Sequence, residues 1–158
     1  MQLLICGSRL IGQVDQDLTG KAAAQSMNRA SAERKFVQEY LSRIHSETPI
    51  TLLVLGEEGG VGGIGLNWAR VNKVQALPWR RLKFPKSTLL NSLKSFRKKE
   101  ASADYVLETI EARNARMLAG SQPELVLAFG GGETTKLLVQ AAKEKGLNVI
   151  EIDMPSFS

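Results

Sequence analysis

The feature that most constrains the fold is an apolar run that stops at three glycines. Residues 125–129 read Leu-Val-Leu-Ala-Phe, which has the length and composition of a buried strand. The glycines that follow are Gly130, Gly131 and Gly132. Thr134 and Thr135 then open a stretch with helical periodicity. A strand, a glycine turn and a helix in this order leave backbone N–H groups at the carboxyl edge of a sheet, where they bind anions. The run therefore predicts an α/β fold with an anion-binding turn.

Further apolar runs alternate with helical patterns along the 158 residues. Strands are predicted at residues 3–6, 50–55, 74–77, 125–129 and 148–152. Helices are predicted from residue 31 to about 47, after residue 64, and at 104–118 and 134–145. Ser31 is the expected N-cap of the first helix, Gly120 the C-cap of the third, and Pro78 the end of the third strand. The alternation predicts a Rossmann-like open parallel sheet of about five strands with helices on both faces.

Two segments interrupt this pattern within a single domain that spans residues 1–158. Residues 10–31 are polar and rich in small side chains without a clear period, which favours a long loop or a partly ordered insertion. Residues 80–104 are the second insertion, and the spacing of their apolar residues is helical in part.

Composition is that of a soluble globular protein, with 43% apolar and 23% charged residues. No apolar stretch approaches the ~20 residues of a membrane span, and the chain opens without a basic leader, so we expect a cytoplasmic protein without membrane contact. Cys6 is the one cysteine and is predicted to be a buried, inert thiol. The sole histidine, His45, is predicted to lie on the surface without a partner. Neither residue belongs to a metal-ligand pattern, and no metal or cofactor is expected.

The net charge of +5 is concentrated in one segment. Residues 80–99 carry eight lysines and arginines and no acid, so the rest of the chain is slightly acidic. Phe84, Phe96 and the nearby Trp79 lie in or beside this segment. Charge together with exposed aromatic rings is typical of single-stranded nucleic-acid binding. A solvated insertion with a small apolar cluster explains the same pattern.

Three turns are expected at the carboxyl edge of the sheet. Gly7, Ser8 and Arg9 follow the first strand, a glycine-rich run from Gly56 follows the second, and the triple glycine follows the fourth. Residues 60–65 match G-x-G-x-x-G, but they follow the second strand and no acid closes the next one, so the match is weak as a dinucleotide fingerprint. Lys136 comes too early for a phosphate-binding P-loop. Each turn alone is explained by a tight connection, whereas three at one edge favour a ligand site.

Arg113 is the most unusual charged residue because it lies on the apolar face of its helix, between Ile110 and Met117. A buried cation needs a partner. One interpretation is an ion pair with Glu133 or Glu57. The other is that its guanidinium binds a ligand phosphate or carboxylate.

Four stretches in the correct order resemble the SLOG superfamily of Rossmann-like nucleotide-binding proteins. They are Leu4-Ile5-Cys6-Gly7-Ser8-Arg9, Gly56-x3-Gly60 leading to Trp68-Ala69, Arg113-Asn114-x2-Met117, and residues 129–135. The family includes the cytokinin-activating LOG phosphoribohydrolases, the DNA-processing protein of natural transformation, and small phage and bacterial proteins. The resemblance implies a pocket for a nucleotide or nucleotide-derived phosphate, and members of the family often form homodimers. The implied pocket residues are Gly7, Ser8, Arg9, Gly56, Gly60, Arg113, Asn114, Gly130, Gly131, Gly132, Thr134 and Thr135.

The chain departs from the family where catalysis depends on carboxylates. LOG enzymes carry Pro-Gly-Gly-x-Gly-Thr-x-x-Glu, and here Gly130 replaces the proline and Leu138 the final glutamate. Gly62 stands where the small-protein branch usually has an aspartate. Phosphate binding is retained and hydrolysis loses its acid–base group, for which Glu133 and Glu57 are the substitute candidates.

Three functions follow, in order of preference. The first is binding of a nucleotide or nucleotide-derived phosphate, to sense or sequester it. The second is single-stranded DNA binding through the basic segment. The third is hydrolysis of nucleoside monophosphates to free base and ribose phosphate. The candidate nucleic-acid contacts are Arg80, Arg81, Arg97, Lys98 and Lys99.

Overall fold

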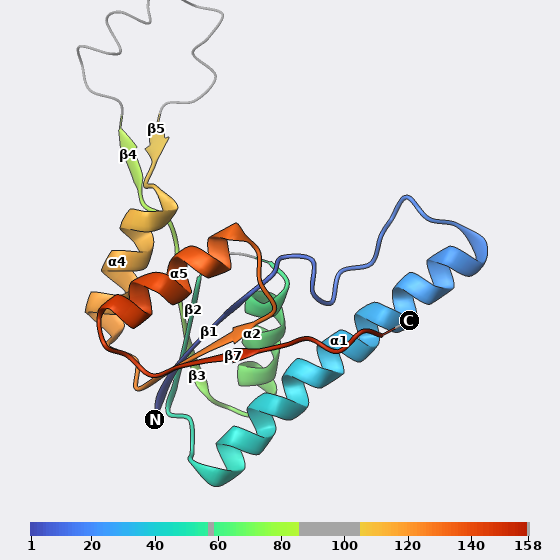
Figure 1. Cartoon of the computed structure of the whole chain (residues 1–158), viewed down its shortest axis with the longest axis horizontal. Helices are drawn as coiled ribbons and strands as arrows, with labels where there is room; N and C mark the ends of the chain where they lie inside the picture. Colours follow the sequence, from blue (N-terminus) through green and yellow to red (C-terminus); the bar gives the residue numbers. More distant parts are fainter. Residues whose placement is uncertain (57–58, 86–104, 158) are drawn as a thin grey trace, which may run out of the picture.

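The computed structural model describes residues 1–56, 59–85 and 105–157. Within them, five parallel strands form one sheet in the order β3-β2-β1-β6-β7 (Figure 1). The strands are β1 (Gln2–Gly7), β2 (Leu52–Gly56), β3 (Gln75–Trp79), β6 (Leu125–Phe129) and β7 (Val149–Ile152). The predicted Rossmann-like parallel sheet is confirmed.

Helices cover both faces of this sheet, as predicted (Figure 1). The helices α1 (Gly20–Glu47) and α2 (Val61–Val71) pack on one face, and α4 (Ile110–Ser121) and α5 (Glu133–Glu144) on the other. The alternation along β1 produces the two cores: Leu3 and Ile5 face α1 and α2, whereas Leu4 faces α4 and α5. These three side chains are at most 1% exposed, and burial of each stabilises the fold by about 1.5–3 kcal/mol.

The order of the strands reverses between β1 and β6. The chain runs outward from β1 through β2 to β3, and then returns to β6 on the other side of β1. Gly7 and Phe129, the last residues of the two central strands, lie opposite each other. In open parallel sheets, ligands bind beyond the carboxyl ends of the strands at such a reversal.

The long loop predicted for residues 10–31 is wrong in its second half. Helix α1 begins at Gly20, and Ser31 lies inside it rather than at its N-cap. Lys, Ala, Gln and Met dominate residues 21–30 and have high helix propensity, which holds this segment helical without a clear apolar period. The N-cap position is Thr19, whose side chain makes no capping hydrogen bond.

Two strand and helix boundaries also differ from the prediction. Pro78 lies inside β3 instead of ending it, because β3 is an edge strand and its proline needs no partner for a missing N–H. Gly120 lies inside α4, whose C-cap residue is Gln122 with φ of 45°. The ring of Trp79 packs where a Cβ of Gly120 would be, which explains the glycine.

The third helix begins later than predicted because its first residues form a strand. Residues 105–107 are β5 (Tyr105–Leu107), which pairs antiparallel with β4 (Lys83–Pro85). We call these two strands the arm; they project beyond α4 (Figure 1). The helical spacing predicted for the basic segment falls mostly on residues 86–104, which lie outside the described residues, as do Arg97, Lys98 and Lys99.

The predictions for His45 and Cys6 both differ from the structure. His45 is half-buried and does have partners: its Nδ1 accepts a hydrogen bond from the Ile50 N–H at 2.9 Å, and its ring packs edge-on against Trp68. Cys6 is half-buried rather than buried. In the parts of the chain that the structure describes, no helix combines the length and the apolar character needed to cross a membrane.

Candidate functional site

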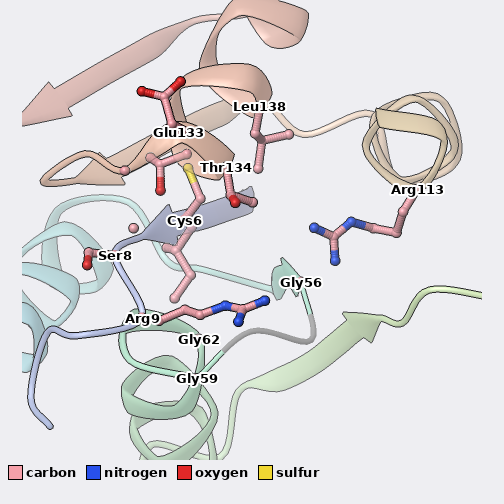
Figure 2. Close-up of a pocket in the computed structure, with 14 residues that line it drawn as sticks. Cys6, Ser8, Arg9, Gly56, Gly59, Gly62, Arg113, Glu133, Thr134 and Leu138 are labelled. Atoms are coloured by element: carbon pink, nitrogen blue, oxygen red, sulfur yellow. The ribbon is translucent and has the colours of Figure 1, made fainter. Parts of the chain in front are cut away.

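A pocket of about 220 Å³ lies at the carboxyl edge of the sheet, where the strand order reverses. Its walls come from the turns after β1, β2 and β6, from the first turns of α5, and from α4 (Figure 2). The three turns that the sequence placed at one edge therefore meet around one cavity. The lining residues are Ile5, Cys6, Gly7, Ser8, Arg9, Gly56, Gly59, Gly62, Arg113, Gly132, Glu133, Thr134, Thr135 and Leu138.

The N-terminus of α5 forms one wall of the pocket. Gly132 is its N-cap residue, in an extended conformation and without a side chain to cap the helix. The first hydrogen bond within the helix runs from the Lys136 N–H to the Gly132 carbonyl. The preceding N–H groups of the first turn therefore have no intrahelical partner, and with the positive end of the helix dipole they favour a bound anion. Thr134 and Thr135 add hydroxyl groups beside them.

The glycines of the turn after β2 and of the first turns of α2 have three different structural roles. Gly60 has φ of 66°, and a Cβ there would collide with the backbone carbonyl oxygens of Ser8 and Arg9. Gly62 lines the pocket, and Gly65 allows α2 to approach Ile5 closely. A tight turn, an open backbone facing the ligand and close helix packing are the three roles of the glycines in G-x-G-x-x-G phosphate-binding turns. The turn thus has the geometry of such a motif, although it follows β2 rather than β1.

Two arginines enter the pocket from opposite sides (Figure 2). Arg9 comes from the turn after β1 and is exposed, and its guanidinium has no hydrogen-bond or ion-pair partner among the described residues. Arg113 comes from α4 and is only 1% exposed. Guanidinium groups bind phosphates and carboxylates through charge-assisted hydrogen bonds, so both side chains favour an anion in the cavity.

Neighbouring groups hold Arg113 in place. Its Nε donates to Asn114 Oδ1 at 3.0 Å, and its Nη1 donates to the carbonyl oxygen of Trp79 at 3.3 Å. The predicted ion pair between Arg113 and Glu133 is wrong. The Glu133 side chain is 90% exposed, pairs with Lys136 and points away from the cavity (Figure 2). The other predicted partner, Glu57, lies outside the described residues.

The base of the arm is joined to α4 by a buried carboxylate. Glu108 accepts hydrogen bonds from Arg116 Nη2 at 2.8 Å and from the Leu82 N–H at 3.0 Å. These bonds, of which the one from Arg116 has the largest effect, hold the pKa of the Glu108 carboxyl below its usual value and outweigh the opposing effect of burial. Arg116 also lies over the ring of Trp79, whose carbonyl binds Arg113. The arm and the buried pocket arginine therefore share one scaffold.

The structure brings most of the predicted ligand-binding residues to the cavity. Gly7, Ser8, Arg9, Gly56, Arg113, Gly132, Thr134 and Thr135 line it. Gly60, Asn114, Gly130 and Gly131 are not among the lining residues. Of these, Gly60 packs against the turn after β1, Asn114 holds Arg113, and Gly130 turns the chain with φ of 66°. Of the nucleic-acid candidates that the structure describes, Arg81 donates from Nε to the Glu108 carbonyl, and the Arg80 carbonyl accepts from Arg116.

Sequence reasoning missed four lining residues and misread one. Cys6 lines the pocket, and its Sγ donates weakly to the Leu127 carbonyl at 3.6 Å, so it is not simply a core thiol. Its place in the pocket could have been predicted from the sequence. Side chains alternate between the two faces of β1, so Cys6 lies on the same face as Leu4, next to the turn that begins at Gly7. The missed residues are Ile5, Gly59, Gly62 and Leu138.

Among residues 1–56, 59–85 and 105–157, no group of three or more His, Cys, Asp or Glu side chains is placed to hold a metal ion. Comparisons of the chain with models of protein families, with curated proteins and with solved structures gave no match. The arguments for function therefore come from the pocket itself.

Proposed function

We propose that this protein binds a nucleotide-type ligand whose phosphate lies in the pocket at the carboxyl edge of the sheet. One observation carries the proposal: the guanidinium groups of Arg9 and Arg113 and the uncapped N-terminus of α5 converge on one cavity. Each of these groups favours negative charge, and arginine matches the geometry of a phosphate better than lysine does. The reversal of strand order at the same point is where open α/β sheets bind nucleotides.

The size of the pocket indicates how much of the ligand it encloses. Its volume of about 220 Å³ is below the roughly 300–1,000 Å³ of pockets that enclose drug-sized ligands. A phosphate with part of the attached sugar is the portion of a nucleotide that such a volume accommodates. The remainder extends out of the pocket.

Binding without hydrolysis is the preferred form of this proposal. Leu138 lines the pocket at the motif position where LOG enzymes carry glutamate, and Glu133 points outward. Within the described lining, no carboxylate is directed into the cavity to serve as an acid or base. The four motifs that resemble the SLOG superfamily support the same assignment, and membership in that family is part of the proposal.

Calorimetric titration with AMP, ADP and inorganic pyrophosphate tests the proposal. We expect at least one of them to bind, and a ligand at about 100 times its dissociation constant to stabilise the fold by ~2.7 kcal/mol. Arg9→Ala should weaken binding about tenfold without changing the unfolding midpoint, since loss of a charge-assisted hydrogen bond is an effect of this size.

Arg70→Ala is the matched control, because Arg70 is an exposed arginine of α2 that bonds only to Asn67 among the described residues. It removes the same charge outside the pocket and should leave binding unchanged. Equal losses for the two variants would indicate a nonspecific charge effect and contradict the proposal. In the same samples AMP should remain intact, and release of adenine would show that the protein is a hydrolase instead.

A further inference from the structure

A second hollow adjoins the pocket on the side of the arm. We call it the arm groove; its volume is about 600 Å³, and Arg9, Gly59, Arg81, Lys83 and Tyr105 are among its lining residues. Arg9 and Gly59 also line the pocket, so the two hollows meet at these residues. A ligand that leaves the pocket past Arg9 enters the arm groove.

The arm turns one of its two faces to this groove. Lys83 pairs with Leu107 and Pro85 with Tyr105, so these four residues lie on one face of the strand pair. Lys83, Tyr105 and Leu107 line the groove. Phe84 and Val106 alternate with them and lie on the opposite face.

The groove combines cations with an exposed aromatic ring. The Lys83 ammonium lies 4.7 Å from the centre of the Tyr105 ring, and Tyr105 is 41% exposed. Arg9, which has no hydrogen-bond or ion-pair partner among the described residues, lines both the groove and the pocket. Cations bind phosphate oxygens, and an exposed tyrosine ring stacks on a nucleobase.

We propose that the arm groove binds the nucleoside end of a nucleoside diphosphate, or of a larger ligand that contains one. The inference rests on the proposed function, because the terminal phosphate occupies the pocket. The inner phosphate then lies near Arg9 and Lys83, and the base stacks on Tyr105. This arrangement accounts for a pocket too small to enclose a whole nucleotide and for the basic, aromatic face of the arm beside it.

A comparison of ADP with inorganic pyrophosphate isolates the base, because both carry two linked phosphates. The full chain is titrated with ADP, with pyrophosphate and with UDP, which carries a different base. We expect at least one of the two nucleoside diphosphates to bind about tenfold more tightly than pyrophosphate. Tyr105→Ala should remove this advantage and leave pyrophosphate binding unchanged. Tyr105→Phe should retain it, because the ring is preserved.

Phe84→Ala is the control on the opposite face of the arm, where it removes a ring that is 48% exposed. It should change neither affinity. Unfolding midpoints of all variants check that the arm variants keep the fold, and Tyr105→Phe provides a second test of the ring should Tyr105→Ala unfold.

The outcomes separate this inference from the function on which it rests. If pyrophosphate and the diphosphates bind equally and Tyr105→Ala has no effect, the pocket stands and the base site is overturned. If none of them binds, the proposed function itself fails. If only a single-stranded oligonucleotide binds, with a steep salt dependence that Tyr105→Ala weakens, the groove holds nucleic acid and the inference is overturned.

Discussion

Helices α2 and α5 both begin in glycine turns at the same edge of the sheet, but the glycines at the two helix starts differ in how closely they are packed. A Cβ at Gly60 would meet the Ser8 and Arg9 carbonyls, and one at Gly65 would meet the side chain of Ile5. Before α5, a Cβ at Gly131 or Gly132 would meet nothing within 4 Å. Glycine lets the backbone approach a neighbour closely in the first case and leaves room for an external partner in the second.

This difference indicates which glycines serve the fold and which serve a ligand. Space beside a glycine with an ordinary φ is not needed for folding, since any residue could stand there. Beside Gly132 that space belongs to the cavity that Arg9 and Arg113 enter. The contrast can be tested by adding side chains one position at a time.

The largest effect is expected for Gly60→Ala. Its φ of 66° with ψ of −120° is a conformation that only glycine adopts easily, and the added methyl group would collide with backbone. We expect a loss of about 3 kcal/mol or more in the free energy of unfolding, measured by urea denaturation. Gly63→Ala, in the first turn of α2, is the control, since nothing lies within 4 Å of its Cβ position, and it should stabilise α2 by up to ~1 kcal/mol. A loss below ~1 kcal/mol for Gly60→Ala would show that the start of α2 is not closely packed against the turn after β1.

Gly132→Asp should separate ligand binding from stability. The extended backbone at this N-cap suits aspartate, whose carboxylate would cap the first turn and complement the helix dipole, for a gain of about 0.5 kcal/mol. The same carboxylate would occupy the anion site, and we expect the affinity for pyrophosphate to fall about 100-fold, or ~2.7 kcal/mol. Denaturation and calorimetry measure the two quantities.

Gly132→Asn is the neutral control for that variant. It caps the helix with a side chain of similar size and no charge, so it should retain more affinity than aspartate. Unchanged pyrophosphate binding in Gly132→Asp would place the anion elsewhere and contradict the proposed site.

The features readable from the sequence are those set by local patterns. Apolar runs at residues 3–6 and 125–129 predicted the central strands, and their glycine turns predicted the edge that holds the pocket. The start of α1 was missed because its first residues favour a helix without an apolar stripe. The pairing of β4 with β5 joins residues about 20 positions apart across the undescribed segment, and no local pattern predicts it.

The same distinction between local patterns and distant contacts applies to the site. The exceptional position of Arg113 was visible as a cation on an apolar helix face, but one of its hydrogen-bond partners, the Trp79 carbonyl, lies 34 residues away in the sequence. Likewise Gly60 and Gly132 look equivalent in the sequence. Only the distances to their neighbours distinguish a packing glycine from one that faces a cavity.

Gly65→Ala tests how tightly α2 is packed, and its effect should be smaller than that of Gly60→Ala. The added methyl group meets the Cδ1 atom of Ile5, the end of a side chain, which can shift more easily than backbone. Improved helix propensity offsets part of the strain, so we expect a net loss of about 1 kcal/mol by urea denaturation. If Gly65→Ala is as stable as Gly63→Ala, α2 is not held closely against β1.

Gly131→Ala should have the smallest effect and decides between two interpretations of the triple glycine. Its backbone has no positive φ and its Cβ position is open. Alanine should therefore raise the free energy of unfolding by about 0.4–1 kcal/mol, because it lowers the conformational entropy of the unfolded chain. The motif implies that Gly131 contacts the ligand, whereas the structure does not include it in the lining of the pocket. An affinity for pyrophosphate within about twofold of wild type supports the structure, because a methyl group outside the lining meets no ligand atom. A clear loss of affinity with the stability retained would show that the phosphate lies against Gly131, and the bound position would then extend from the pocket across the whole turn.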